Sequence, residues 1–350
     1  MPMTSRERLM TAFECGLPDR VPVAPFHLGN LDPDSAIAGE LIETTDIIIR
    51  TGGAGVSFFG SGADTRTETD GDLTITTIET PRGPLRSVRK TTEQTSAQIE
   101  FPCSTADDIE KLLSVPYEPT EPDPTEFNAW KDRIGDEGVV MAGVIDPICI
   151  PAIYFSPEDF CLLWADAPQA MVELVQVAAD RMVPSIDRAC RAGFDAFRIV
   201  GGEYASTQLG PKAFETLVVG PDRRMCDVMH DHGALAYNHN HGPLMDYLDM
   251  LIEIDMDACD CFEAPPWGDA DLRLVKQKLQ GEVCIVGNLD DMEVIERLDA
   301  EEVCDIARQR IEEAGPDGFV LGGTASGTYT EKAARNFMVM VEVSREMAAG

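Results

Sequence analysis

The stretch that decides the fold is VCIVGNLDDMEVIERLDAEEVCDIARQRIEEAGPDGFVLGG, residues 283–323. It begins with a short β-rich apolar run and continues through a segment of helical periodicity that ends on Gly315. A second apolar run follows at residues 318–323. A strand, a helix and another strand in this order are typical of a βαβ unit, in which the two strands are parallel.

The same alternation extends along the rest of the chain. Short β-rich runs, most of them followed by amphipathic segments, predict eight strands at residues 21–26, 55–59, 139–144, 196–200, 234–239, 257–262, 283–288 and 318–323. Eight parallel strands within 350 residues predict an α/β fold of the (β/α)8 TIM-barrel class. We expect a single domain over residues 1–350.

One insertion interrupts the alternation between the second and third predicted strands, at residues 70–127. Two β-rich runs around Pro81-Arg82-Gly83 predict a β-hairpin within residues 70–93. Residues 114–127 are rich in proline and predict a surface crossing. We expect the insertion to cover one mouth of the barrel.

The composition excludes several classes of function. The net charge of −34 argues against binding to nucleic acid or to an anionic membrane surface. No run approaches the roughly 20 apolar residues of a membrane span, and residues 1–16 lack the apolar core of a secretory signal. The ten cysteines show no disulfide spacing, so we expect reduced thiols and a cytoplasmic location.

Two histidines mark the end of the fifth predicted strand, in ALAYNHNHGPLMDYL, residues 234–248. His239 and His241 are two residues apart, so they lie on the same face while the strand geometry lasts. Reactive side chains of such barrels gather at the carboxyl ends of the strands. Two imidazoles at this position predict a metal site, since imidazole suits zinc, iron and similar ions. A hydrogen-bonded structural or substrate-binding role is the alternative.

The next predicted strand supplies the third ligand. Its end reads DACDCFEAPPWGD, and Glu263 follows Cys261 by two residues. Glu263 gives a His₂Glu set with an open position for water or substrate. Cys261 is the second choice for this ligand, because it lies deeper along the strand.

Polar and aromatic side chains at other strand ends are candidates for contact with a substrate. The expected catalytic and positioning residues are Glu203, His27, Asn288 and Asp146. The expected substrate-binding residues are Tyr204, Trp267 and Phe59. Thr324 and Ser326 end the eighth strand in a glycine-rich run, and a capping or loop hydrogen bond is the alternative role for each such residue.

Five segments, in this order, resemble the uroporphyrinogen decarboxylase superfamily. They are SRERLMTAFECGLPDRVPVAPF (5–26), NHNHG (238–242), CFEAPP (261–266), LVKQKLQGEVCIVGNLDD (274–291) and GFVLGGTASG (318–327). The decarboxylases proper act on a tetrapyrrole without a metal, and their early Arg-rich motif is replaced here by HLGNLDPDS, residues 27–35.

The other branch of the superfamily holds cobamide-dependent methyltransferases, which are zinc enzymes with a His-x-Cys-Gly motif and a second cysteine after the eighth strand. Here the motif reads His239-Asn240-His241-Gly242, and residues 322–326 contain no cysteine. The resemblance therefore implies a metal position with a different ligand set, and it disfavours transfer to a thiol such as coenzyme M.

The resemblance is compatible with a methyltransferase that uses an O-methyl donor. Such an enzyme takes the methyl group from a small methoxylated molecule and passes it to a corrinoid (cobalamin) on a partner corrinoid protein. Zinc or another divalent metal would act as a Lewis acid on the ether oxygen. Glu203, Asn288 and Asp146 would position the substrate, and His27 would hydrogen-bond it. The resemblance is also compatible with a homodimer.

Three alternatives remain. The first is a metal-free decarboxylase of the uroporphyrinogen decarboxylase type that acts on another carboxylated substrate. The second is a metal-dependent hydrolase or lyase on the same barrel. The third is a non-catalytic protein that binds a corrinoid or tetrapyrrole.

Overall fold

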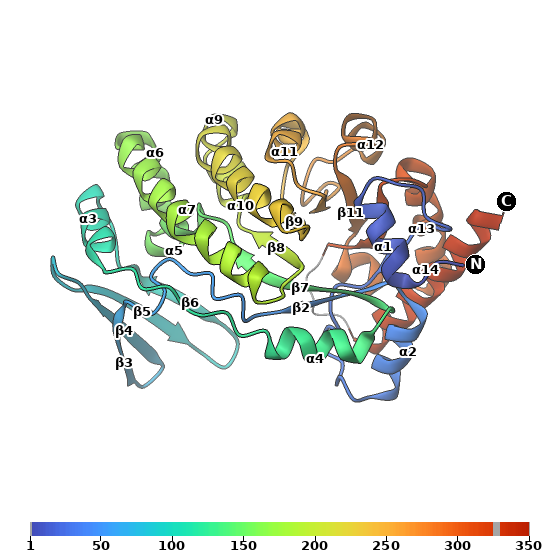
Figure 1. Cartoon of the computed structure of the whole chain (residues 1–350), viewed down its shortest axis with the longest axis horizontal. Helices are drawn as coiled ribbons and strands as arrows, with labels where there is room; N and C mark the ends of the chain where they lie inside the picture. Colours follow the sequence, from blue (N-terminus) through green and yellow to red (C-terminus); the bar gives the residue numbers. More distant parts are fainter. Residues whose placement is uncertain (1, 325–329, 350) are drawn as a thin grey trace.

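The computed structural model describes residues 2–324 and 330–349. Eight parallel strands form one sheet, in the spatial order β1 (Val23–Ala24), β12 (Phe319–Gly323), β11 (Cys284–Leu289), β10 (Ala258–Cys261), β9 (Leu235–Asn240), β8 (Ala196–Val200), β7 (Gly138–Ile145) and β2 (Ile47–Thr51). Phe26, which follows β1, forms a parallel bridge with Ile48 of β2. This bridge brings the two edges of the sheet together, so the sheet is a nearly closed barrel, as predicted (Figure 1).

Helices surround the barrel. Their bounds are α1 Ser5–Phe13, α2 Ala36–Thr44, α3 Ala106–Ser114, α4 Thr125–Ile134, α5 Cys149–Tyr154, α6 Pro157–Asp166, α7 Pro168–Arg191, α8 Glu203–Gln208, α9 Pro211–Phe214, α10 Gly220–Asp231, α11 Leu248–Ile254, α12 Leu272–Leu279, α13 Ala300–Ala314 and α14 Glu331–Ala349. Three short helical turns complete the set: η1 Glu215–Val219, η2 Met245–Tyr247 and η3 Asp291–Ile295.

The predicted βαβ unit at residues 283–323 is confirmed as β11, α13 and β12. Asp299 and Glu302 form a capping box at the start of α13, which satisfies backbone N–H groups that have no partner within the helix. Val303, Ala307 and Ile311 recur at four-residue spacing and are buried. One face of α13 therefore packs on the barrel while its charged face meets solvent.

The predicted second strand is wrong. The strand is β2, the IIIRT run at Ile47–Thr51, and not residues 55–59. Gly53, Gly55 and Gly60 all adopt positive φ angles, so the segment between them turns repeatedly and does not extend. Its apolar residues Phe58 and Phe59 are buried as loop anchors. The IIIRT run follows α2 after only Thr45 and Asp46, which hides the boundary between helix and strand in the sequence.

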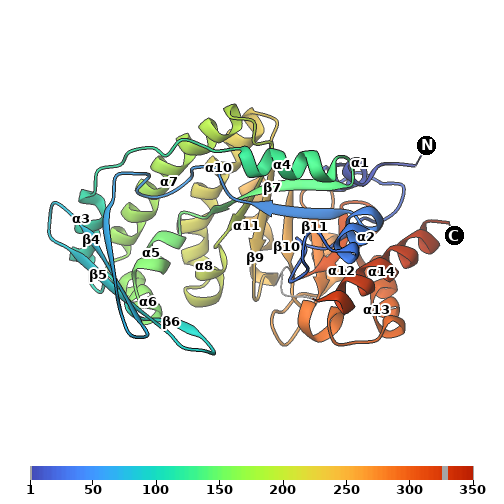
Figure 2. The same cartoon turned by 90° about the horizontal axis from the view of Figure 1, so that it is seen from below.

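The insertion after β2 is larger than predicted. The hairpin is confirmed as β4 (Leu73–Glu79) and β5 (Leu85–Thr91), but β3 (Asp64–Asp70) and β6 (Ser96–Glu100) flank it in a four-stranded antiparallel sheet. Figures 1 and 2 both show this sheet beside α3, at the end of the molecule opposite α13 and α14. The proline-rich crossing that follows is fixed to α7, because Tyr117 Oη donates to the carbonyl of Arg181 at 2.8 Å.

The interior of the barrel is filled with apolar side chains. Alternate residues of the strands, among them Ile48, Ala196 and Tyr237, form one buried cluster with Leu9 and Phe13 of α1. Helix α1 therefore closes the amino-terminal end of the barrel. On five strands the next inward-facing residue, toward the carboxyl end, is polar, as expected for this fold: Arg50, Arg198, His239, Asp260 and Asn288.

Within the described part of the chain, none of the helices has both the length and the apolar character that crossing a bilayer requires.

Candidate metal centre

The two predicted histidines lie where β9 ends, beside the end of β10. The strands pair in parallel, with Asp260 opposite His239 and Cys261 opposite Asn240. His239 is the penultimate residue of β9, and His241 follows the strand directly. The rings of His239 and His241 are 4.4 Å apart between centroids and almost perpendicular, at 84°.

Cys261 completes a group of three donors with these histidines. Its Sγ lies 3.5 Å from His239 Nδ1 and 3.6 Å from His241 Nδ1. A tetrahedral zinc ion with bonds of about 2.0 Å to nitrogen and about 2.3 Å to sulfur separates these two kinds of ligand by about 3.5 Å. The three side chains, whose ligand atoms all lie within 4.8 Å of one another, therefore have the spacing of a metal site.

Glu263, the predicted third ligand, lies beside this group. Its Oε1 is 3.1 Å from His241 Nδ1, and its Oε2 accepts the backbone N–H of Gly242 at 2.8 Å. Burial acts to raise the pKa of Glu263, but the hydrogen bonds from His241 and Gly242 lower it below its usual range. The same hydrogen bond raises the pKa of His241. Ligation by Glu263 stays a prediction, whereas Cys261, the second choice, is in position.

Asp260 holds the other histidine. Both of its carboxylate oxygens lie 3.0 Å from His239 Nδ1, and the side chain is buried. Burial acts to raise the pKa of Asp260, but the charges of His239 and Arg198 lower it. Each Nδ1 that faces Cys261 thus also contacts a carboxylate, so Asp260 and Glu263 lie beside the donor group and add negative charge to it.

The Cys261 thiol lies in surroundings that favour binding of a cation. Burial raises its pKa well above the usual range, and the charges of Asp260 and Glu263 raise it further. The same negative surroundings favour a divalent ion, which displaces the thiol proton when it binds. Two imidazole nitrogens and a sulfur suit zinc. The donor set therefore fits such an ion.

The backbone around Cys261 is tightly fixed. Phe262 adopts a φ of 49°, which is rare for a bulky residue, and its carbonyl accepts a hydrogen bond from Asn288 Nδ2 at 2.8 Å. Gly287, on β11, has a φ of 132°, and a Cβ there would lie 2.7 Å from the carbonyl oxygen of Cys261. Only glycine fits at that position, and this close approach positions the end of β10.

A cavity of about 460 Å³ adjoins the metal centre. Glu263 and Thr324 lie on its border with the centre, and Cys261 Sγ contacts the Thr324 carbonyl at 3.1 Å. Asn288 and Trp267 line the cavity, and Trp267 is 62% exposed. The structure thus brings Asn288, a predicted positioning residue, and Trp267, a predicted substrate-binding residue, to a space next to the candidate metal donors. Ser326 lies outside the described residues.

Other predicted residues are arranged differently. Glu203 and Tyr204 begin α8, and the charge of Glu203 contributes to the raised pKa of His241. Phe59 is buried against Phe58 and Tyr154 and does not line the 460 Å³ cavity.

His27 follows β1 and stacks edge-on against Trp130, with ring centroids 5.9 Å apart. It is not part of the group of His239, His241 and Cys261. Burial and the charge of Arg50 lower the pKa of His27.

Asp146 has no exposed surface, in contrast to the expected substrate contact. It follows β7, accepts the backbone N–H of Ile148 at 2.9 Å, and lies beside Asp222 of α10. Burial raises the pKa of Asp222 to about 7. Burial and the charge of Asp222 raise the pKa of Asp146 well above its usual range. The two carboxyl groups form a buried pair on the outer face of β8 and β9, away from the barrel interior.

Sequence reasoning missed Asp260, Arg198 and Arg50. Each is a charged residue within an apolar strand, at an inward-facing position of the barrel. This pattern could have identified the three residues from the sequence, because a charge in a buried strand is costly unless it has a partner or a function.

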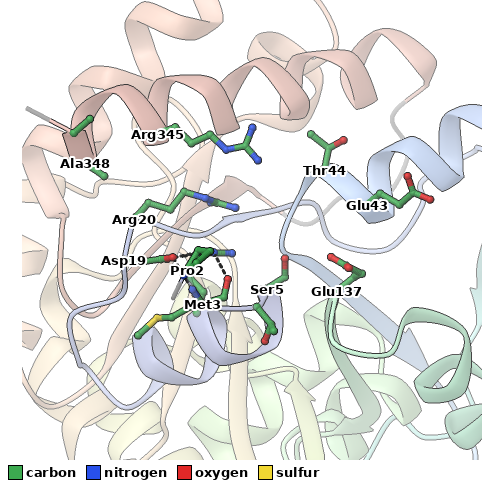
Figure 3. Close-up of a pocket in the computed structure, with 13 residues that line it drawn as sticks. Pro2, Met3, Ser5, Asp19, Arg20, Glu43, Thr44, Glu137, Arg345 and Ala348 are labelled. Carbon is green, nitrogen blue, oxygen red and sulfur yellow. Dashed lines mark hydrogen bonds and ion pairs between the residues drawn. The ribbon is translucent and has the colours of Figure 1, made fainter.

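A further cavity, of about 560 Å³, lies at the opposite end of the barrel (Figure 3). Its lining residues precede the starts of β1, β2 and β7 or belong to α1 and α14. Its buried charges already satisfy one another: Arg8 and Arg20 both pair with Asp46, and Arg8 also pairs with Asp19. We assign this end of the barrel to stability, as is usual for the fold.

The fold and the donor set define a (β/α)8-barrel protein with a candidate metal centre at the carboxyl ends of its strands. Residues 88–347 match the family described as Uroporphyrinogen decarboxylase (URO-D), so the chain belongs to the uroporphyrinogen decarboxylase family. A search among curated proteins found no significant match.

One solved structure shares the fold over the whole chain. A methyltransferase from Methanosarcina mazei superposes with a TM-score of 0.67 at 12% identity, over 99% of each chain. A B12-independent methionine synthase from Shewanella sp. W3-18-1 gives a TM-score of 0.47 at 10% identity, over 83% of this chain and 76% of that chain. The first similarity extends over the whole chain and establishes the shared architecture.

Proposed function

We propose that this protein is a metal-dependent methyltransferase that moves a methyl group from an O-methyl donor to a corrinoid carried by a partner protein. The observation that carries the proposal is the group formed by His239, His241 and Cys261 beside the 460 Å³ cavity. Membership in the uroporphyrinogen decarboxylase family and the fold shared with a methyltransferase support it.

His239, His241 and Cys261 would hold zinc, and Glu263 is the candidate for a fourth position. Bound there, the ion supplies Lewis acidity, which stabilises the negative charge that develops on the donor oxygen as the methyl group leaves. A corrinoid on the partner protein would accept the methyl group as the C–O bond of the donor breaks. The oxygen then takes a proton from water.

The residues of the chain have separate tasks in this scheme. Asp260 and Glu263 keep the two imidazoles in place through their contacts with Nδ1. Asn288 fixes the turn after β10 and, with Trp267, lines the cavity where the donor binds. Glu203, Tyr204 and His27 surround the barrel mouth and contribute to positioning.

Metal content is the first test. Purified protein is expected to contain about one zinc ion per chain by elemental analysis, and His239→Ala and Cys261→Ala should lose it. Cys259→Ala is the matched control, because Cys259 lies on the same strand and packs in the outer core, away from the donor group. Unchanged metal content in the Cys261 variant would overturn the proposed donor set.

Methyl transfer is the second test. Free cob(I)alamin is the probe, and a panel of methoxylated compounds supplies the donor. Formation of methylcobalamin, followed by its absorption spectrum, should require the zinc-loaded protein and should fail for His241→Ala. Methylcobalamin formation by a metal-free preparation would overturn the role of the metal.

Membership in the uroporphyrinogen decarboxylase family is also compatible with one alternative function, a metal-free decarboxylase of another carboxylated substrate. It predicts carbon dioxide release without stoichiometric zinc. A hydrolase or lyase on the same centre would act without any corrinoid. A binding protein would change the corrinoid spectrum without turnover.

A further inference from the structure

Two arginines project into the barrel at its carboxyl end. Arg50 is on β2, two residues after Ile48, and Arg198 is on β8, two residues after Ala196. Ile48 and Ala196 belong to the cluster inside the barrel. Since side chains alternate along a strand, both arginines lie on the inner face, one layer above this apolar core.

Arg198 is a buried cation without a hydrogen-bond acceptor among the described residues. Its side chain is 2% exposed, and neither Nε nor Nη2 makes a hydrogen bond. Its guanidinium stacks on the ring of Phe26 at 4.4 Å, and Nη2 is 3.8 Å from Asp260 Oδ2, which is too far for a hydrogen bond. Buried guanidinium groups are normally hydrogen-bonded, so this one is arranged for an acceptor that the chain does not supply.

Arg50 adds a second uncompensated charge. It is exposed, and no hydrogen bond or ion pair joins it to any residue in the described ranges. Burial of part of its side chain and the charge of Arg198 both lower the pKa of Arg50, which places the two cations near each other. Several other exposed arginines of this acidic chain pair with carboxylates, as Arg66 does with Glu79.

The arginines adjoin the metal centre. Asp260 Oδ2 lies 3.8 Å from Arg198 Nη2, and the same oxygen lies 3.0 Å from His239 Nδ1. If the anionic group of a small molecule binds the two arginines, the rest of that molecule lies beside the donor group of His239, His241 and Cys261. The single charge of Asp260 is shared between Arg198 and His239, so Arg198 has no carboxylate to itself.

We propose that Arg50 and Arg198 bind a carboxylate of the methyl donor, which makes methoxylated carboxylic acids the substrate class. This inference rests on the proposed methyltransferase function. The planar fork of a guanidinium matches a carboxylate with two parallel hydrogen bonds. The carboxylate satisfies the buried Arg198 and directs the methoxy group toward the metal centre.

Calorimetric titration tests the site without any corrinoid. Methoxyacetate and 4-methoxybenzoate are compared with their neutral counterparts, methoxyacetamide and 4-methoxybenzamide, at low ionic strength. At least one acid should bind at least about tenfold more tightly than its amide, the discrimination expected from a charge-assisted hydrogen bond. Arg50→Gln should remove most of this preference, and Arg50→Lys should restore part of it.

The control is Arg89→Gln, which removes an exposed arginine from β5 of the antiparallel sheet and should leave the preference unchanged. Melting temperatures verify that each variant is folded. Equal binding of acid and amide, no saturable binding of either acid, or full discrimination in the Arg50→Gln variant would overturn the proposal. Displacement of the acids by equimolar inorganic phosphate would assign the site to phosphate and overturn the carboxylate class.

Failure of this site and failure of the proposed function give different results. Acid binding that depends on Arg50, without methyl transfer to cob(I)alamin from any methoxylated acid, would retain the anion site and reject the methyltransferase. Methyl transfer from neutral ethers, with acid binding unaffected by Arg50→Gln, would retain the methyltransferase and reject the anion site.

Discussion

Asp260 and His239 face each other across two neighbouring strands, with both carboxylate oxygens 3.0 Å from His239 Nδ1. The contact is buried at the point where β9 and β10 approach the metal centre. It orients an imidazole that lies 3.5 Å from the Cys261 sulfur. Asp260 is therefore a positioning residue for the donor set.

Asp260→Asn should weaken zinc binding by at least about tenfold, because it removes a buried negative charge beside the donor group. Competition with a chromophoric chelator measures the affinity. Asp257→Asn is the matched control, because Asp257 also pairs with a histidine, His230 at 3.1 Å, but at the amino-terminal end of the sheet. Equal loss of zinc affinity in the two variants would contradict the positioning role.

The buried pair of Asp146 and Asp222 predicts a pH-dependent stability. Burial raises the pKa of Asp222 to about 7, well above its value in the unfolded chain. The folded state therefore holds a proton that the unfolded state has released, and stability falls as pH rises. The contribution of Asp222 is complete below about pH 4 and is lost as pH approaches 7.

Melting temperatures of the wild type and Asp222→Asn, measured from pH 5.5 to pH 8, check this sign. The wild type should lose stability relative to the variant as pH rises, because asparagine does not ionise. A difference in melting temperature that stays constant across this range would contradict the raised pKa.

Gly287→Ala should disturb the metal centre through the backbone. Its Cβ would lie 2.7 Å from the Cys261 carbonyl oxygen, which forces the end of β10 to move. We expect lower zinc content and a loss of stability that includes about 1–3 kcal/mol from overpacking. Gly281→Ala is the control, because Gly281 also has a positive φ of 81° but no atom within 4 Å of a Cβ. The free energy of unfolding of that variant should fall by about 1 kcal/mol, and its zinc content should stay unchanged.

Trp267→Ala should affect the substrate and not the fold. The side chain is 62% exposed and lines the cavity beside Glu263, so its removal costs little stability, within about 0.5 kcal/mol. The KM for the methyl donor should rise while zinc content stays constant. Leu17→Ala, a truncation of a side chain that is 64% exposed at the amino-terminal end of the barrel, should change neither quantity.

Much of the barrel could be predicted from periodicity, because each βαβ unit repeats the same burial pattern. The second strand could not, since the IIIRT run at Ile47–Thr51 almost directly follows α2, while residues 55–59 have strand-like composition. The distinction depends on glycines with positive φ, such as Gly53 and Gly55, and these angles are set by contacts with residues 120–123.

The histidine pair was predictable from its spacing, but the ranking of Cys261 below Glu263 was not supported. The turn at Phe262 carries Glu263 away from the line of the strand and toward His241 Nδ1. Cys261, at the last position of β10, remains level with the two imidazoles. Both side chains lie near His241 Nδ1, so the choice between the two ligands stays a prediction.

The three donors all come from residues 239–261, on one pair of adjacent strands. The barrel itself closes elsewhere, where Phe26 meets Ile48. Capture of the ion therefore needs only the docking of β9 on β10, a local event in sequence with a small entropic cost of loop closure. On the proposed function, zinc supplied during synthesis would accordingly bind a partly assembled chain and stabilise the pairing of these two strands.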